Sequence, residues 1–64
     1  MKYPWPTNPV EGHKHTYESF FVAGFPLEEL QREVFQEALQ LNYQIRYEPG
    51  ILNGMYGIRV TRVR

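Results

Sequence analysis

The segment from Pro26 to Leu41, PLEELQREVFQEALQL, is the part of the sequence that most constrains the fold. Its apolar residues recur at three- and four-residue spacing, which at 100° per residue places them on one stripe of a helix. They are Leu27, Leu30, Val34, Ala38 and Leu41. Glu and Gln residues, Glu33 and Glu37 among them, form an opposite face that is expected to be solvated. The pattern predicts one amphipathic helix over 26–41, and the other segments have to pack against its stripe.

The ends and the flank of this helix follow from the same segment. Pro26 suits the first helical position, where its missing N–H is not needed. No Ser, Thr, Asp or Asn stands at the N-cap, so the helix start is expected to be weakly capped. Asn42 is expected to end the helix in a left-handed conformation. Phe35 and Leu39 lie beside the stripe and are expected to widen the core face, with an exposed shoulder for a partner as the alternative.

Two segments after the helix are predicted to form a hairpin. Residues 43–48 and 56–64 alternate apolar and polar side chains, which is typical of half-buried strands. Asn53-Gly54 between them is the strongest two-residue hairpin signal. The alternation and the turn residues therefore agree on an antiparallel pair.

The position of the turn sets the register of this hairpin. Pairing residues whose numbers sum to 107 places Tyr47 opposite Val60 and Glu48 opposite Arg59. Apolar side chains then face each other, and so do opposite charges. Pro49, Gly50 and Gly57 are expected to interrupt the hairpin with a bulge or to splay its tip, and a longer loop over 49–57 is the alternative.

The chain before the helix divides into an arm and a strand. Three prolines within 1–12 predict an extended arm, which leaves 13–64 as the folded domain. The residues from 15 to 25 are dense in β-formers and are predicted to form the first strand. Both faces of that strand carry a phenylalanine, Phe20 on one and Phe21 on the other. We therefore expect one of these rings to be exposed or to be met by a partner.

These elements predict a small α+β domain with the order β-α-β-β. A three-stranded sheet carries one helix on one face, and the Pro-rich arm precedes it. A chain of 64 residues makes one domain, and at this size folding buries only about 60% of the surface of the unfolded chain. The pattern does not fix which face of the sheet the helix covers. The other face has no second helix to shelter it.

Ten aromatic residues are a heavy load for one helix and one small sheet to bury. The arm is expected to cover some of them, and a partner protein to cover others. Trp5, the only tryptophan, is expected to fold back and cap the edge of the core. Docking of the arm into a partner is the alternative, and it makes Trp5 and Tyr3 candidate contact residues because Trp is enriched in binding hot spots.

Signals for an enzyme, a metal site or a cofactor are weak. There is no cysteine, and the single serine, Ser19, stands in a predicted strand without a nucleophile motif. His13 and His15 supply two imidazoles, fewer than the three or four ligands of a zinc site. The glycines form neither a dinucleotide fingerprint nor a phosphate loop. We expect no catalysis, no metal and no cofactor.

Charge and hydropathy narrow the choice of partner. Seven basic and seven acidic residues give zero net charge, and no apolar run reaches the roughly 20 residues of a membrane span. No membrane partner is expected. No signal-peptide core follows Lys2, and the lack of cysteine suits a reducing compartment, so a cytoplasmic location is expected.

The most strongly indicated function is protein binding. The excess of aromatics, the uncovered sheet face and the separation of a negative helix from a positive sheet end favour it. The candidate contact residues are Tyr3, Trp5, Phe20, Arg46, Arg59 and Arg62. Single-stranded nucleic-acid binding by these arginines with Tyr47 or Tyr56 is the alternative. Self-association through the uncovered face or a sheet edge is a third hypothesis.

The end of the chain also carries a resemblance. Val60-Thr61-Arg62-Val63-Arg64, which closes a chain with the order strand, helix, strand, resembles the close of the small T7-type phage inhibitors of bacterial RNA polymerase. The resemblance covers five consecutive residues and the element order. It implies a small phage or bacterial accessory or inhibitory factor that docks on a larger host protein or complex.

Overall fold

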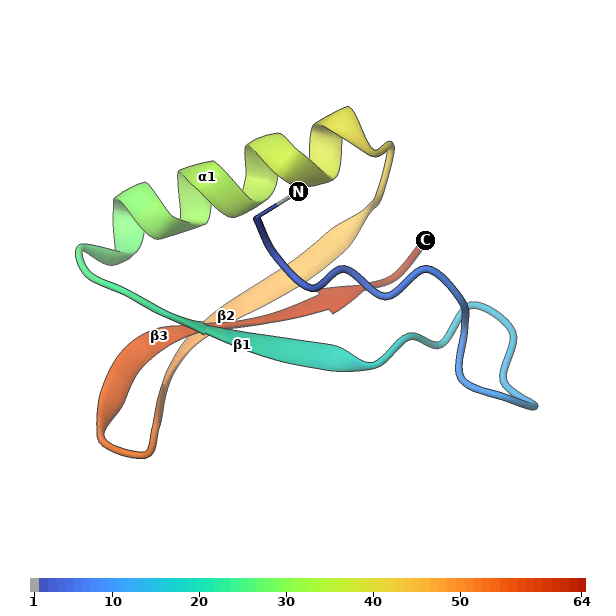
Figure 1. Ribbon diagram of the computed structural model, residues 1–64, viewed down its shortest axis with the longest axis horizontal. Coiled ribbons are helices and arrows are strands. Elements are labelled where there is room, and N and C mark those ends of the chain that lie inside the picture. Colours follow the sequence, from blue (N-terminus) through green and yellow to red (C-terminus); the bar gives the residue numbers. More distant parts are fainter. Residues whose placement is uncertain (1) are drawn as a thin grey trace.

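The computed structural model describes residues 2–64 and places one helix on a three-stranded sheet (Figure 1). In chain order the elements are β1 (Ser19–Ala23), α1 (Leu27–Gln40), β2 (Ile45–Leu52) and β3 (Met55–Arg62). Both β1 and β2 pair antiparallel with β3, so the order in the sheet is β1-β3-β2. The predicted α+β architecture and the element order β-α-β-β are confirmed.

α1 begins and ends within one residue of the predicted bounds. Pro26 is the N-cap, with φ −74° and ψ 151°, rather than the first helical residue, and no side chain caps the first turn. At the other end Asn42 adopts φ 60°, as expected. The backbone N–H of Asn42 donates to Leu39 O, and that of Tyr43 donates to Ala38 O. This pair of bonds is a Schellman motif, which satisfies carbonyls that the last helical turn leaves free.

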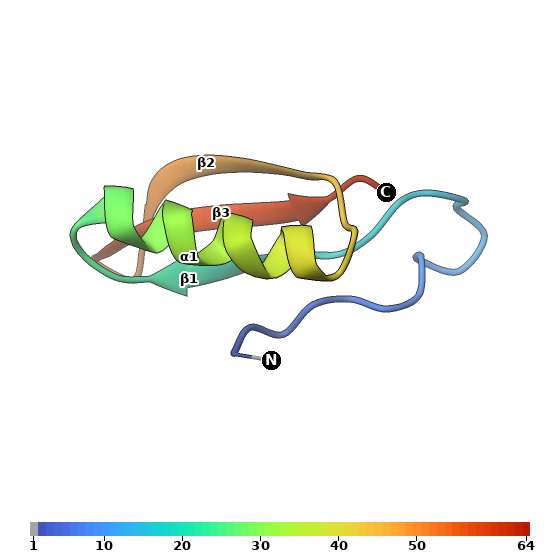
Figure 2. The same cartoon turned by 90° about the horizontal axis from the view of Figure 1, so that it is seen from above.

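The core lies between the apolar stripe of α1 and the central strand β3. Val34 of α1 and Ile58 and Val60 of β3 are fully buried. Figure 2 shows that α1 lies over one face of the sheet only. The expectation that Phe35 and Leu39 widen the core is wrong, because they are 48% and 60% exposed. A three-stranded sheet offers no further strand beneath that flank of the helix.

The hairpin of β2 and β3 has the register expected from the sequence. Tyr47 pairs with Val60, and the ladder runs without interruption to a two-residue turn at Asn53-Gly54. Both turn residues have positive φ, 52° and 77°, as a type I′ turn requires. The expected bulge or splayed tip is wrong. Counted from the turn, Pro49 falls at a non-hydrogen-bonded position of an edge strand, where its missing N–H breaks no ladder bond.

β1 is shorter than the predicted strand over 15–25. It begins at Ser19, whose partner Thr61 lies one residue before the end of β3. Residues before Ser19 therefore have no strand to pair with. Instead His15 adopts φ 62°, and the backbone N–H of Val10 donates to Thr16 O, which closes a loop.

The register assigns alternate residues to two faces of the sheet. The face under α1 carries mainly apolar side chains, namely Phe20, Val22, Ile45, Tyr47, Ile58 and Val60. The open face carries Ser19, Phe21, Ala23, Arg46, Glu48, Gly50, Leu52, Met55, Gly57, Arg59 and Thr61. The open face thus changes from polar at the end of β3 to apolar at the hairpin turn.

Gly57 brings β1 and β3 together at the centre of the sheet. A Cβ added at Gly57 would collide with Val22 O and come within 2.8 Å of Ala23 Cα and 2.9 Å of Phe21 Cε1. Gly50, which pairs with Gly57, has only Phe21 Cε2 near, at 3.9 Å. The Phe21 ring therefore lies over a floor made by two facing glycines, and only Gly57 is sterically obligatory.

Substitution of these paired glycines separates their roles. We expect Gly57→Ala to lower the free energy of unfolding by at least about 2 kcal/mol, because backbone atoms of β1 have to move. Gly50→Ala is expected to change it by less than about 1 kcal/mol. Urea unfolding of both variants, followed by circular dichroism, measures the difference. Equal stabilities would contradict the close approach of β1 to Gly57.

Candidate partner-binding surface

The N-terminal arm is docked along α1 by two glutamates. The Tyr3 hydroxyl donates to Glu33 Oε2 at 2.9 Å, and Lys2 Nζ lies 3.1 Å from the same oxygen. Trp5 Nε1 donates to Glu37 Oε1 at 2.9 Å. Glu33 and Glu37, expected to belong to a solvated helix face, are instead the acceptors that hold the arm.

The Trp5 ring fills the space between the arm, β1 and the turn after α1. It packs edge-on against Phe20, with ring centroids 5.2 Å apart, and against Tyr43 at 5.7 Å. Tyr3 is buried in the core cluster, and Phe20 packs against that cluster. Trp5 thus folds back and caps the edge of the core, as expected from the sequence, and the alternative had been docking of the arm into a partner. The candidate contact residues Tyr3, Trp5 and Phe20 all lie inside the chain's own packing.

Electrostatics favour the docked arm around neutral pH. Burial raises the pKa of Tyr3 to about 12, with a further contribution from the hydrogen bond to the Glu33 carboxylate. The hydrogen bonds from Tyr3 and Lys2, and the charge of Lys2, lower the pKa of Glu33 from its ordinary value. Glu33 therefore stabilises the docked arm above pH 4.5, and this contribution is lost as pH falls through its lowered pKa. The Tyr3 contribution is complete below pH 10 and is lost as pH rises through 12.

Arg62, another candidate contact residue, is a clamp between the arm and the end of the sheet. Its guanidinium carbon lies 3.6 Å from the centroid of the Tyr43 ring and 4.2 Å from that of Tyr17. Its Nη1 donates to Pro6 O at 2.8 Å, and its Nε to Arg64 O at 3.2 Å. A planar guanidinium suits this stacked position, where an ammonium would not.

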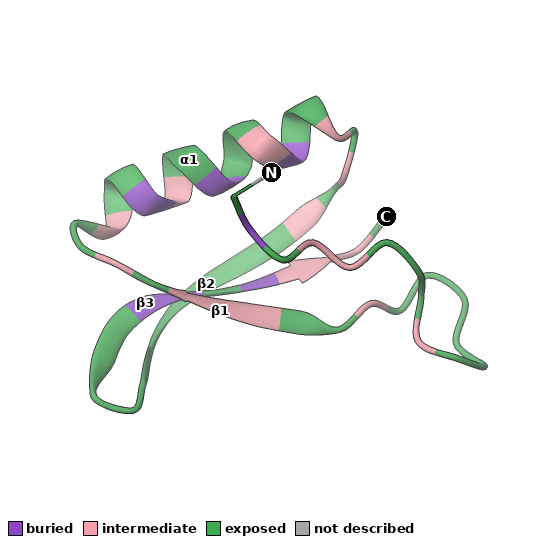
Figure 3. Cartoon of the chain, in the orientation of Figure 1, coloured by how far each residue is buried: buried purple, intermediate pink, exposed green. Residues whose placement is uncertain are grey.

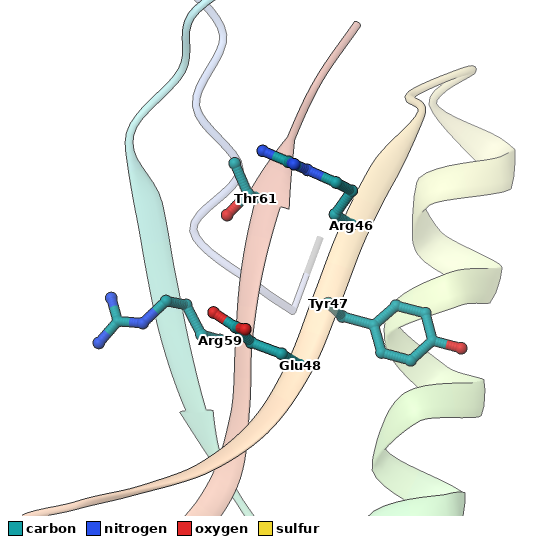
Figure 4. A pocket seen from close by; sticks show the side chains of 5 residues that line it. All are labelled: Arg46, Tyr47, Glu48, Arg59 and Thr61. Atoms are coloured by element: carbon teal, nitrogen blue, oxygen red, sulfur yellow. The ribbon is translucent and has the colours of Figure 1, made fainter.

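Arg46 and Arg59 occupy the open face of the sheet. With Tyr47, Glu48 and Thr61 they line a shallow hollow of about 260 Å³ (Figure 4). Figure 4 shows Arg59 reaching toward β1 and Tyr47 pointing to the other side, toward α1. Glu48 and Arg59 are paired in the ladder as expected, yet no ion pair joins them. Within residues 2–64, the one ion pair is that of Lys2 with Glu33.

Several large apolar residues are exposed at and beside the hairpin turn. We define the hairpin cluster as Phe25, Ile51, Leu52, Met55 and Tyr56, which are 84%, 62%, 44%, 55% and 59% exposed. The backbone N–H of Gly24 donates to Tyr56 O, so the turn before α1 adjoins the hairpin. Figure 3 shows the whole hairpin end as exposed. The ladder of β2 with β3 and its two-residue turn support these side chains.

A second exposed apolar set lies on the flank of α1. Phe35 and Leu39 occupy the side of the helix opposite the arm, and Tyr47 of the edge strand β2 is 43% exposed. These three residues are the flank set. They lie at a different place from the hairpin cluster and serve as a natural comparison for it.

Comparison with protein-family models, with curated proteins and with solved structures finds no match to this chain. Within the described residues, no three His, Cys, Asp or Glu side chains gather closely enough to hold a metal ion. The only helix in that part of the chain, α1, has 14 residues and is too short and too polar to cross a bilayer. The geometry of the chain's own residues therefore has to carry the functional assignment.

Only part of this candidate surface was predicted from the sequence. Arg46 and Arg59 share the open face, as expected, but four other candidate residues are engaged within the fold. The hairpin cluster was missed, although four large apolar residues flank Asn53-Gly54 directly in the sequence. That run is the signal that could have found it, because residues beside a two-residue turn lie at the end of a sheet and have few neighbours.

The clamp formed by Arg62 gives a stability prediction. We expect Arg62→Lys to lower the free energy of unfolding by about 1–2 kcal/mol, because stacking and the bond to Pro6 O are lost while the charge stays. Arg59→Lys, on the open face, is the control and should change it by less than about 0.5 kcal/mol. Thermal and urea unfolding measure both. An Arg62→Lys variant as stable as the control would show that the clamp contributes nothing.

The docked arm gives a pH prediction, with Trp5 as the single fluorescent reporter. Below pH 4.5 we expect the emission to shift to longer wavelength, because protonation of Glu33 releases Lys2 and weakens the bond from Tyr3. In Glu33→Gln part of the shift should already be present at neutral pH, and the acid change should be smaller. Glu48→Gln is the control, since Glu48 lies on the open face of the sheet, away from the arm. Identical titrations of the two variants would contradict the role of Glu33.

Proposed function

We propose that this chain is a small non-catalytic module that binds another protein or protein complex. The observation that carries the proposal is the hairpin cluster, five large apolar side chains that are 44–84% exposed at one end of the molecule. Exposed apolar patches of this kind usually mark sites of protein interaction. The support is a continuous ladder closed by a two-residue turn, so binding needs to order little additional backbone.

The size of the core supports the same proposal. The buried apolar residues are Tyr3, Leu30, Val34, Ala38, Ile58 and Val60, and the arm already contributes one of them. Four of the ten aromatic rings, those of Phe25, Phe35, Tyr47 and Tyr56, stay exposed. A large part of each ring stays in contact with water in the free chain. Docking at the hairpin cluster would bury the rings of Phe25 and Tyr56.

Single-stranded nucleic-acid binding is the second candidate, and Arg46 and Arg59 favour it. Both arginines lie on the open face without an ion-pair partner among residues 2–64. Tyr47 and Tyr56, however, belong to the opposite face by the register. Bases stacked on these tyrosines would therefore be separated by the sheet from the arginines that should hold their phosphates. The geometry favours protein binding.

The resemblance of residues 60–64 extends the proposal. A strand-helix-strand order closed by Val60-Thr61-Arg62-Val63-Arg64 is what the chain shares with T7-type inhibitors of RNA polymerase. On this basis we propose a phage or bacterial accessory or inhibitory factor that acts in the cytoplasm on a larger host complex.

Affinity capture tests the proposed function. The immobilised chain is expected to retain a protein from nuclease-treated bacterial lysate, and to retain it from about 50 to 300 mM NaCl, because apolar contacts are little affected by salt. A fluorescent single-stranded oligonucleotide is expected not to bind. If the oligonucleotide binds, with an affinity that falls steeply with salt and is lost in Arg46→Ala and Arg59→Ala, the second candidate replaces the first.

A further inference from the structure

We propose that the hairpin end of this molecule inserts as a preformed apolar finger into a cleft of its partner protein, and that Lys or Arg side chains of the partner rim that cleft. This inference rests on the proposed function and names the surface and the chemistry of the partner. It follows from the shape of the hairpin end, from the distribution of apolar side chains over it, and from its charge.

The hairpin end is apolar on both faces. By the register, Ile51 and Tyr56 lie on the face that α1 covers elsewhere, and Leu52 and Met55 lie on the open face. All four are exposed, because the hairpin end bends away from α1 (Figures 1 and 3). A flat partner surface could bury only one of the two pairs. A cleft buries both, so a concave occupant fits this end better than a flat one.

The charge at this end is negative. Residues 24–29 and 49–57 contain two carboxylates, Glu28 and Glu29, and no Lys, Arg or His. Lys2 lines a hollow together with Phe25 and Glu29, but its charge is paired with Glu33. Neither Glu28 nor Glu29 forms an ion pair, since the pair of Lys2 with Glu33 is the only one found over 2–64. Both glutamates lie in the first turn of α1, where the helix dipole offsets about half of one unit charge. A net negative charge beside Phe25 remains, and it matches cationic side chains around the partner's cleft.

The same charge argues against two other occupants. A second copy docked tip to tip would bring two pairs of carboxylates together, which is unfavourable. An anionic membrane surface would repel Glu28 and Glu29 as the apolar tip approached. The basic residues of the chain concentrate at the other end of the sheet, where Arg46 pairs with Thr61 and Arg62 ends β3. That end is left free to face outward or to contact a second region of the partner.

A matched pair of substitutions tests where the finger binds. Ile51 in the hairpin cluster and Leu39 in the flank set are almost equally exposed, at 62% and 60%. With the purified captured partner, we expect Ile51→Ser to weaken binding by at least about 10-fold and Leu39→Ser by less than about 3-fold. Unfolding curves should match the wild type for both, since neither side chain is in the core. If the wild type captures a partner but the two variants lose affinity equally, or Leu39→Ser loses more, the inference is overturned while the proposed function stands.

Charge reversal tests the rim of the cleft. Glu28→Lys combined with Glu29→Lys should slow association by about 3- to 10-fold at low salt and have little effect at high salt. Glu11→Lys combined with Glu18→Lys, which changes the net charge equally at exposed positions outside the hairpin end, is the control. Equal effects of the two double variants would overturn the cationic rim.

Two further measurements decide between occupants. Because the chain has no cysteine, Asn53→Cys carries a single benzophenone label at the turn and Lys14→Cys carries one in the loop before β1. Only the label at position 53 should cross-link to the partner, at a partner peptide that adjoins Lys or Arg residues.

Two other occupants are tested directly. If the chain binds phosphatidylcholine–phosphatidylglycerol vesicles, or forms a dimer in sedimentation, and Ile51→Ser abolishes that binding or that dimer, the inference is overturned. Failure of the wild type to capture any protein overturns the proposed function and this inference together.

Discussion

The packing of Val34 on Ile58 and Val60 is the interaction on which the rest of the structure depends. These three side chains are fully buried, and they join the only helix of residues 2–64 to the central strand. A 14-residue helix is about 21 Å long, whereas eight residues of strand span about 26 Å. The helix is shorter than the hairpin, and the hairpin end bends away from it (Figure 1). The exposed hairpin end follows from both.

The arm and the glycine pair solve the two problems that a single helix leaves. On the covered face, Tyr3 and Trp5 fill the gap beside α1 that a second helix would fill in a larger domain, and Glu33 and Glu37 satisfy their polar atoms. On the open face, Phe21 lies against the backbone of Gly57, so one ring is partly sheltered without a covering layer. Each solution uses aromatic area where a chain of 64 residues lacks aliphatic core.

Most of the fold could be predicted from the sequence because its signals are local. The period of the α1 stripe, the Asn42 cap and the register around Asn53-Gly54 each depend on residues within one element or one turn. The errors concern what lies beside an element. Phe35 and Leu39 were expected in the core because helical periodicity cannot say how many strands lie beneath a flank. Pro49 was expected to break the ladder because its position at the outer edge depends on the strand order.

The candidate site was harder to predict for the same physical reason. Whether Arg62 faces a partner or stacks between Tyr17 and Tyr43 depends on three segments far apart in the sequence. Residue type was a poor guide, since the tryptophan that looked like a hot spot is engaged in the fold. A better guide would have been the position of apolar residues relative to the end of the covering helix.

An apolar hairpin end is a liability that the chain would be expected to lose if it had no use. Exposed strand ends with apolar side chains promote association, and charges near such ends are the usual protection. Here the protection is partial, because Glu28 and Glu29 adjoin the cluster while the eight residues from 49 to 56 carry no charge at all. A serine or lysine at Ile51 or Met55 would leave the core untouched, since neither side chain belongs to it. The core therefore does not require apolar residues at these positions, which supports the proposed contact with a partner, and the adjoining carboxylates favour a cationic surface for that contact.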